Sequence, residues 1–212
     1  QQRKISSDKW KELLALAHSD KAQVFEDYTN YYLSTNGQLY WTDTHQLGYY
    51  DENYEEYLKK TLPDYKTGSL MISEVYVPRQ RIYDFMTALS LSNEKQQLEI
   101  IYGTIRLIET DTETFLPWAK QDYACIVLNL RVEHSLLGLE KARSDFQLLI
   151  DAALNYGGSY FLTYHRWARK DQLLEAYPQF PMFLELKLKY DPQEIFQSDW
   201  YRFYKEMFNN NE

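Results

Sequence analysis

Arg106 is the side chain in this sequence whose type and position most suggest chemistry at an anion. It lies in GTIRLIE, an alternating segment typical of a β-strand, so it shares one face with Thr104 and Tyr102. A rigid, planar guanidinium in that position suits a carboxylate, a phosphate or a developing oxyanion. The alternative is an ordinary solvated charge, and the spacing alone leaves both interpretations open.

A second group of reactive side chains lies in TYHRWA, where Tyr164, His165 and Arg166 follow one another. The segment reads as the exit of a strand, a position where binding pockets are common. His165 has the chemistry of a general base or a hydrogen-bond partner. A lone histidine is more often a structural hydrogen-bonding residue, so this alternative also stays open.

The sequence has none of the short motifs that mark common stand-alone catalytic sites. It contains no GxGxxG or GxxxxGK[ST] phosphate loop, no HExxH, no CxxC and no GxSxG. Its four histidines are dispersed, so we expect no metal site. The single cysteine, Cys125, sits in an apolar strand and is interpreted as an inert core thiol.

Charge and composition exclude several kinds of partner. The net charge of −8 argues against nucleic acid and against anchoring on anionic lipid. No apolar run is long enough to span a membrane, and the opening QQRKISSDKW has no signal-peptide core. One cysteine allows no disulfide within the chain, so we expect a reduced, cytoplasmic compartment.

Hydrophobic periodicity predicts an α+β fold for the larger part of the chain. Strands are expected over 69–78, 98–109 and 122–133, a strand that runs into a loop over 159–168, and helices over 79–92 and 135–156. This order is the split βαβ, or ferredoxin-like, arrangement, with an antiparallel sheet and helices on one face. Gly157 and Gly158 predict the end of the second helix.

The first third of the chain is predicted to be a helical appendage. Ser6 and the residues after it can cap a first helix, a second spans 22–33, and a third polar helix falls within 50–60. A soft boundary near residues 63–68 separates this lead-in, residues 1–67, from the α+β domain, residues 68–212. After residue 169 the pattern is mostly helical, interrupted by prolines.

Several strings occur in one order and at one spacing: SEVYVPRQRIYDFM, YGTIRLIETDTETFLPW, DYACIVLNL, GGSYFLTYHRWA and LKLKYDPQEIFQSDW. They resemble the C-terminal, substrate-binding (cap) domain of FAD-linked oxidases. This is the vanillyl-alcohol oxidase-like superfamily, near its aldonolactone and alditol oxidase branch. The resemblance covers about residues 68–202, and residues 8–67, with NGQLYWTDTHQL, are similar to the segment that joins the two domains of such enzymes.

The resemblance implies a role in an FAD-dependent oxidoreductase that oxidises an alcohol or lactone-type substrate by hydride transfer to flavin. In such enzymes another domain binds FAD through a glycine-rich loop, and this chain has no such loop. We therefore expect an FAD-binding domain in cis or in trans, and weak or no FAD binding by these residues alone. A fragment, a separately encoded cap and a remnant all fit this expectation.

The resemblance also assigns roles to individual residues. Related oxidases often carry Glu-Ile-Arg where this chain has Thr104-Ile105-Arg106, so Arg106 would balance charge near flavin and substrate, whereas Thr104 puts a sugar-alcohol substrate in doubt. A related His-Trp-Gly-Lys aligns loosely with residues 163–166. The implied catalytic residues are Arg106, His165 and Arg166; the implied substrate contacts are Tyr102, Thr104, Tyr164, Ser198, Asp43 and His45.

A second hypothesis keeps the fold but not the chemistry. The chain would then be a non-catalytic ferredoxin-like binding or dimerisation module, and an exposed aromatic face would pair with another copy to give a homodimer. The two hypotheses differ in one structural respect. An oxidase cap requires Arg106, His165 and Arg166 to converge on one concave surface, and a binding module does not.

Overall fold

The structure, a computed structural model, describes residues 3–39, 54–62 and 64–209, apart from the side chains of residues 54 and 93–95. It combines helices with a four-stranded antiparallel sheet, which confirms the predicted α+β class. The chain divides into two compact units, residues 1–69 with 131–134 and residues 70–130 with 135–212.

The N-terminal unit is built on helices. Its described helices are α1 (Ser7–Ser19), α2 (Lys21–Ser34) and α4 (Tyr54–Thr61). The Ser6 side chain accepts a hydrogen bond from the Lys9 backbone N–H and so caps α1, as the sequence predicts. α1 contacts both α2 and α4, and Leu13 of α1 and Leu58 of α4 are buried.

The second unit contains the sheet. Its elements, in chain order, are β1 (Gly68–Pro78), η1 (Arg79–Arg81), α5 (Ile82–Gln96), β2 (Ile100–Ile108), β3 (Tyr123–Glu133), α6 (Leu136–Asn155) and β4 (Ser159–Tyr160). The first residues of β1 and the last residues of β3 belong to the N-terminal unit. The strands lie in the order β2-β3-β1-β4, with β2 antiparallel to β3 and β1 antiparallel to β4.

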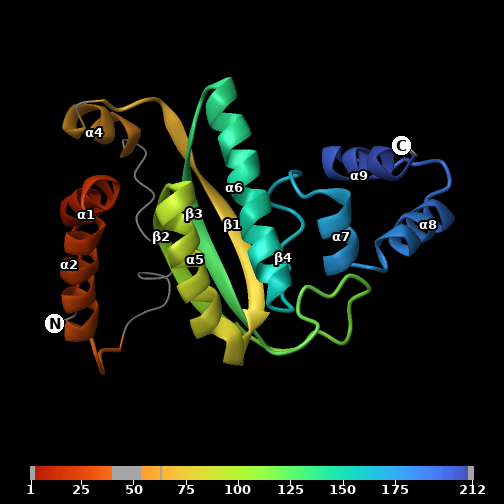
Figure 1. Ribbon diagram of the computed structural model, residues 1–212, viewed down its shortest axis with the longest axis horizontal. Coiled ribbons are helices and arrows are strands. Elements are labelled where there is room, and N and C mark those ends of the chain that lie inside the picture. Colours follow the sequence, from red (N-terminus) through yellow and green to blue (C-terminus); the bar gives the residue numbers. More distant parts are fainter. Residues whose placement is uncertain (1–2, 40–53, 63, 210–212) are drawn as a thin grey trace. The chain divides into compact units, whose positions relative to one another are not determined.

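Helices α5 and α6 cover one face of this sheet (Figure 1). Strand side chains alternate between faces, and Val75 of β1 and Ile126 of β3 point to the same side. They join one buried core with Phe85 of α5 and Phe146 of α6. Burial of this apolar surface is the main force that holds the two helices on the sheet.

A pair of glycines ends α6 and allows a close approach to β1. Gly157 has a φ of 73°, the left-handed conformation in which helices commonly end, so the predicted glycine cap is confirmed. A Cβ added to Gly158 would lie only 1.9 Å from the Tyr76 carbonyl oxygen. Only glycine fits there, and the tight turn brings Ser159 and Tyr160 into register with β1.

The last predicted strand is much shorter than its pattern suggests. β4 holds only Ser159 and Tyr160, although the sequence predicts extended structure further along. Beyond it the Phe161 N–H still donates to the Glu74 carbonyl of β1, at 3.0 Å. The Leu162 carbonyl accepts the Trp200 indole N–H, 2.9 Å away, on the side of the chain turned away from β1.

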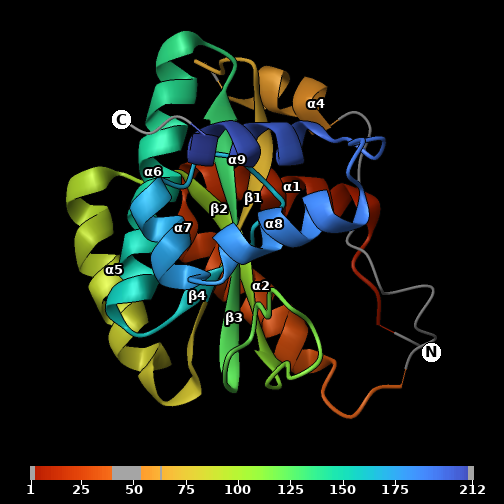
Figure 2. The same cartoon turned by 90° about the vertical axis from the view of Figure 1, so that its right-hand side faces the viewer.

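Three short helices complete the second unit and lie at the β4 side of the sheet (Figure 2). They are α7 (Lys170–Ala176), α8 (Phe180–Tyr190) and α9 (Asp199–Asn209). The gap between α7 and α8 holds Pro178, and Pro181 lies in the first turn of α8, so the predicted interruption is confirmed. Within the described residues, no helix is both long and apolar enough to cross a membrane.

Candidate functional site

The candidate site lies on the sheet face turned away from α5 and α6, which we call the distal face. A second, smaller core cluster marks it: Tyr76, Ala119, Tyr123, Cys125 and Val127. Glu74 is two residues from Tyr76 on β1 and therefore points to the same face. The distal face thus combines aromatic side chains with a carboxylate.

Glu74 accepts hydrogen bonds from three side chains, and these four residues form the Glu74 cluster. The Tyr76 hydroxyl donates to Oε1 at 2.7 Å, and the Cys125 thiol contacts the same oxygen at 3.2 Å. The Tyr164 hydroxyl donates to Oε2 at 3.1 Å. Glu74 is only 8 % exposed, and a buried carboxylate requires such donors to offset its desolvation.

The three donors all keep their protons at neutral pH. Burial raises the pKa of the Cys125 thiol to about 12, and the Glu74 charge acts in the same direction. Burial, followed by the hydrogen bond to Glu74, raises the pKa of Tyr76. Burial and Glu74 also raise the pKa of Tyr164, against a smaller opposing effect of Arg106. The cluster therefore holds one negative charge, on Glu74, surrounded by neutral hydrogen-bond donors.

Arg106 reaches this cluster across the β2–β3 ladder. In the register of the two strands, Arg106 lies opposite Cys125, Thr104 opposite Val127 and Tyr102 opposite Asn129. These β2 side chains therefore share the distal face. Arg106 is exposed, and within the described chain no carboxylate forms an ion pair with it. Its charge nevertheless acts on Cys125 and Tyr164, which places a cation at the edge of the cluster.

A row of aromatic rings crosses the distal face. Successive ring centroids are 6.2 Å apart from Tyr123 to Tyr76, 5.9 Å from Tyr76 to Trp118, 5.6 Å from Trp118 to Phe161 and 4.9 Å from Phe161 to Tyr164. Trp118 is 41 % exposed and Tyr164 is 44 % exposed. The row is therefore buried at one end and open at the other, where an apolar planar molecule could stack.

The loop that carries Trp118 is held in place by its own hydrogen bonds. Asp111 accepts the backbone N–H groups of Glu113 and Thr114, at 2.9 and 3.1 Å. Asp122 accepts both the N–H and the hydroxyl of Thr110. The loop has no strand pairing of its own, and these side-chain hydrogen bonds hold it instead. A segment outside regular secondary structure therefore still positions its tryptophan.

His165 lies on the other side of the sheet. Its ring contacts Phe146 of α6, with centroids 4.1 Å apart, and stacks near Trp167 at 5.6 Å. It is buried, and burial lowers its pKa to about 4. Among the described groups no partner is found for its buried Nδ1. His165 is therefore a neutral core residue, remote from the cluster on the distal face.

Arg166 and Ser198 serve the C-terminal helices. An Arg166 guanidinium N–H donates to the Asp199 carbonyl at 3.2 Å, and the group lies 5.8 Å from the Phe203 ring. The Ser198 hydroxyl accepts the Tyr201 N–H at the start of α9. Both contacts stabilise the beginning of that helix. The other two predicted contacts, Asp43 and His45, lie outside the described residues.

The structure thus separates the predicted site residues. It brings Tyr102, Thr104, Arg106 and Tyr164 to the distal face, and it places His165 and Arg166 elsewhere. Sequence reasoning missed Glu74 and Trp118. The sequence did contain a signal for Glu74. It is an acidic residue in the largely apolar strand SEVYVP, two positions before Tyr76 and therefore on the same face as that tyrosine. No comparable signal marks Trp118, which depends on the fold of its loop.

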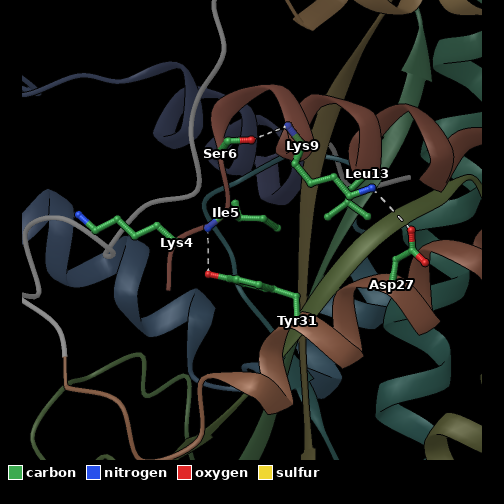
Figure 3. A pocket seen from close by; sticks show the side chains of 7 residues that line it. All are labelled: Lys4, Ile5, Ser6, Lys9, Leu13, Asp27 and Tyr31. Carbon is green, nitrogen blue, oxygen red and sulfur yellow. Dashed lines mark hydrogen bonds and ion pairs between the residues drawn. The ribbon is translucent and has the colours of Figure 1, made fainter. Parts of the chain in front are cut away.

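The N-terminal unit contains a different feature, an open hollow of about 390 Å³ beside α1 and α2 (Figure 3). Its polar groups already bind one another. The Ile5 N–H donates to the Tyr31 hydroxyl at 3.1 Å, and the Lys9 ammonium lies 3.8 Å from the Asp27 carboxylate. With no polar groups converging on its centre, the hollow is a weaker candidate than the distal face.

Comparison with known proteins gives no family for this chain. No protein-family model matches it, and no curated protein matches it at a significant level. Among the described residues, no three His, Cys, Asp or Glu side chains are grouped so that they could hold a metal ion. The site must therefore be interpreted from its own geometry.

Proposed function

We propose that this chain is the cap, or substrate-binding, domain of an FAD-dependent oxidoreductase that oxidises an alcohol or lactone-type substrate. One observation carries the proposal most directly. The distal face joins an open aromatic row to a buried carboxylate and an exposed guanidinium. A planar ring would stack on the row, and the polar groups would meet the substrate beside it.

The topology supports the same assignment. The order β1-α5-β2-β3-α6-β4, with strands arranged β2-β3-β1-β4, is what a ferredoxin-like split βαβ fold requires. On the other face Tyr76 and Cys125 are buried, whereas Trp118 and Tyr164 leave an exposed part to which a second component would bind. We assign that face to the flavin ring held by an FAD-binding domain, in cis or in trans.

The distal face fits only one part of the cofactor. Trp118 and Tyr164 offer ring surface to the isoalloxazine, and Arg106 offers a positive charge. The glycines of this chain form no phosphate-binding loop, so the diphosphate belongs to the other domain. When bound, flavin would accept the hydride. The residues of this chain would orient the substrate, exclude water and receive the hydroxyl proton.

Expression of the complete gene, with any FAD-binding domain that it encodes or is co-transcribed with, tests this proposal. We expect the purified protein to show the visible absorption of bound flavin, and an alcohol or lactone-type substrate to bleach it without oxygen. Removal of residues 68–212 should leave flavin bound but abolish bleaching. A full-length product without flavin, or bleaching that survives this deletion, would contradict the proposal.

A non-catalytic dimerisation module is the second candidate, because β2 is an edge strand of the sheet. Ile105 and Leu107 on its face toward the helices are 52 % and 68 % exposed. Edge strands with exposed apolar side chains readily pair with a second copy. Light scattering separates the candidates: a dimer that Ile105→Lys converts to monomers, in a protein that never binds flavin, would favour this module.

A further inference from the structure

The two oxygens of the Glu74 carboxylate lie in different surroundings. Its Oε1 atom faces two buried donors, Tyr76 and Cys125, at 2.7 and 3.2 Å. Its Oε2 atom faces Tyr164, at 3.1 Å, and this tyrosine is 44 % exposed. Of the three donors, only Tyr164 reaches both the carboxylate and the open part of the distal face.

This arrangement connects a buried proton acceptor to the surface through one phenol. The Tyr164 hydroxyl can accept a hydrogen bond from outside while it donates its own proton to Oε2. Tyr76 and Cys125 stabilise the ionised carboxylate from the other side, since hydrogen bonds to a charged acceptor are strong. Arg106, across the ladder, adds a positive charge that acts on Tyr164.

We propose that Tyr164 and Glu74 form a proton relay for the hydroxyl group of the substrate, an inference that rests on the proposed oxidoreductase function. The substrate O–H bond breaks as its proton passes to the Tyr164 oxygen, and the Tyr164 proton passes to Glu74 Oε2. Oxidised flavin, when held by the partner domain, would supply the oxidant, and the electron pair of the substrate C–H bond would leave to it as hydride. A C=O bond forms, and Glu74 ends as a neutral carboxylic acid.

In this scheme Tyr164 is the catalytic residue because it touches the substrate, and Glu74 is a positioning residue and the final proton acceptor. Glu74 is unlike the acidic residue implied by the resemblance, because it lies on β1 rather than at Thr104 of β2. The relay requires a primary or secondary alcohol as substrate. A substrate without a hydroxyl on the oxidised carbon would not use it.

Single-turnover reduction of the flavin in the full-length protein tests the relay. We expect Tyr164→Phe and Glu74→Gln each to lower the rate constant for reduction by an alcohol at least about 100-fold. Half-saturation by substrate should change by less than about threefold. Tyr76→Phe is the matched control, since it removes a bond to the same carboxylate from the buried side, and it should cost less than about tenfold.

An infrared difference spectrum gives a readout that a merely structural role would not produce. Reduction of the flavin should add the carbonyl band of a protonated carboxyl group, and Glu74→Gln should remove that band. Equal losses in Tyr164→Phe and Tyr76→Phe, or an unchanged spectrum in Glu74→Gln, would overturn the relay while flavin reduction in the unmodified protein upholds the proposed function. If no alcohol reduces the unmodified protein, the proposed function fails and the relay fails with it.

Discussion

The two faces of the sheet use similar residues in opposite ways. On the α5 and α6 face, His165 is packed against Phe146 with its Nδ1 unsatisfied among the described groups, so it stays neutral and inert. On the distal face, Glu74 is as deeply buried as His165, but three side chains donate to it and one of them is exposed. Burial alone does not make a site. A buried titratable group becomes useful when hydrogen bonds connect it to the surface.

The largest effect that tests this contrast is expected from Phe146→Ala. Phe146 is fully buried between α6 and the sheet, and it contacts the rings of His165 and Trp167. Removing its ring leaves a cavity, and we expect the free energy of unfolding to fall by about 3–5 kcal/mol. Urea denaturation followed by circular dichroism measures the loss. A cost below about 1 kcal/mol would mean that this face is not the main core.

The next effect concerns acid and His165. Burial lowers the pKa of His165 from 6.5 to about 4, so between these values the unfolded chain binds a proton that the folded chain does not. Stability should therefore fall as the pH falls from about 6.5 to about 4, by roughly 3 kcal/mol in total. Unfolding in urea at several pH values measures this change in the free energy of unfolding.

His165→Gln supplies the control for that titration. The variant has no imidazole at this position, so its free energy of unfolding should depend less on pH over the same interval. Identical curves for His165→Gln and the unmodified chain would show that folding does not lower the pKa of His165.

On the distal face, Glu74→Gln should have a smaller effect on stability. The amide keeps the size of the side chain but replaces one acceptor oxygen with a donor, so either Tyr76 or Tyr164 loses its acceptor. We expect a cost of about 2 kcal/mol in the free energy of unfolding at neutral pH. A stabilised Glu74→Gln variant would indicate that the ionised carboxylate is retained for function at the expense of stability.

Much of the fold was predictable, because its elements have strong local patterns. The strand pattern of 69–78, the apolar run within 122–133 and the glycines after α6 predicted β1, β3 and the end of that helix. β4 was overestimated: only Ser159 and Tyr160 form a strand, and after Phe161 the chain turns toward the C-terminal helices, where the Trp200 indole binds the Leu162 carbonyl. Tertiary contacts of this kind are not visible in a local pattern.

The candidate site was predictable only in part. Tyr102, Thr104 and Arg106 could be assigned to one face because a strand has a period of two, and the structure keeps them together. In an unbroken strand Tyr164 would share the face of Tyr160 and His165 that of Phe161. The irregular chain after β4 reverses the two, so that Tyr164 contacts Phe161 and His165 contacts Phe146. Periodicity cannot predict side-chain direction once the regular strand has ended.

The smallest expected effect, from Trp118→Ala, sharpens the contrast with Phe146. Both are aromatic residues next to the sheet, but Trp118 is 41 % exposed and contacts Tyr76 and Phe161 mainly at ring edges. We expect its removal to cost only about 1 kcal/mol of stability, a typical value for a partly exposed aromatic contact. The same change should weaken flavin-dependent turnover strongly, because it removes ring surface from the open part of the aromatic row. If Trp118→Ala destabilises the chain as much as Phe146→Ala does, the distal face is a second core rather than a binding surface.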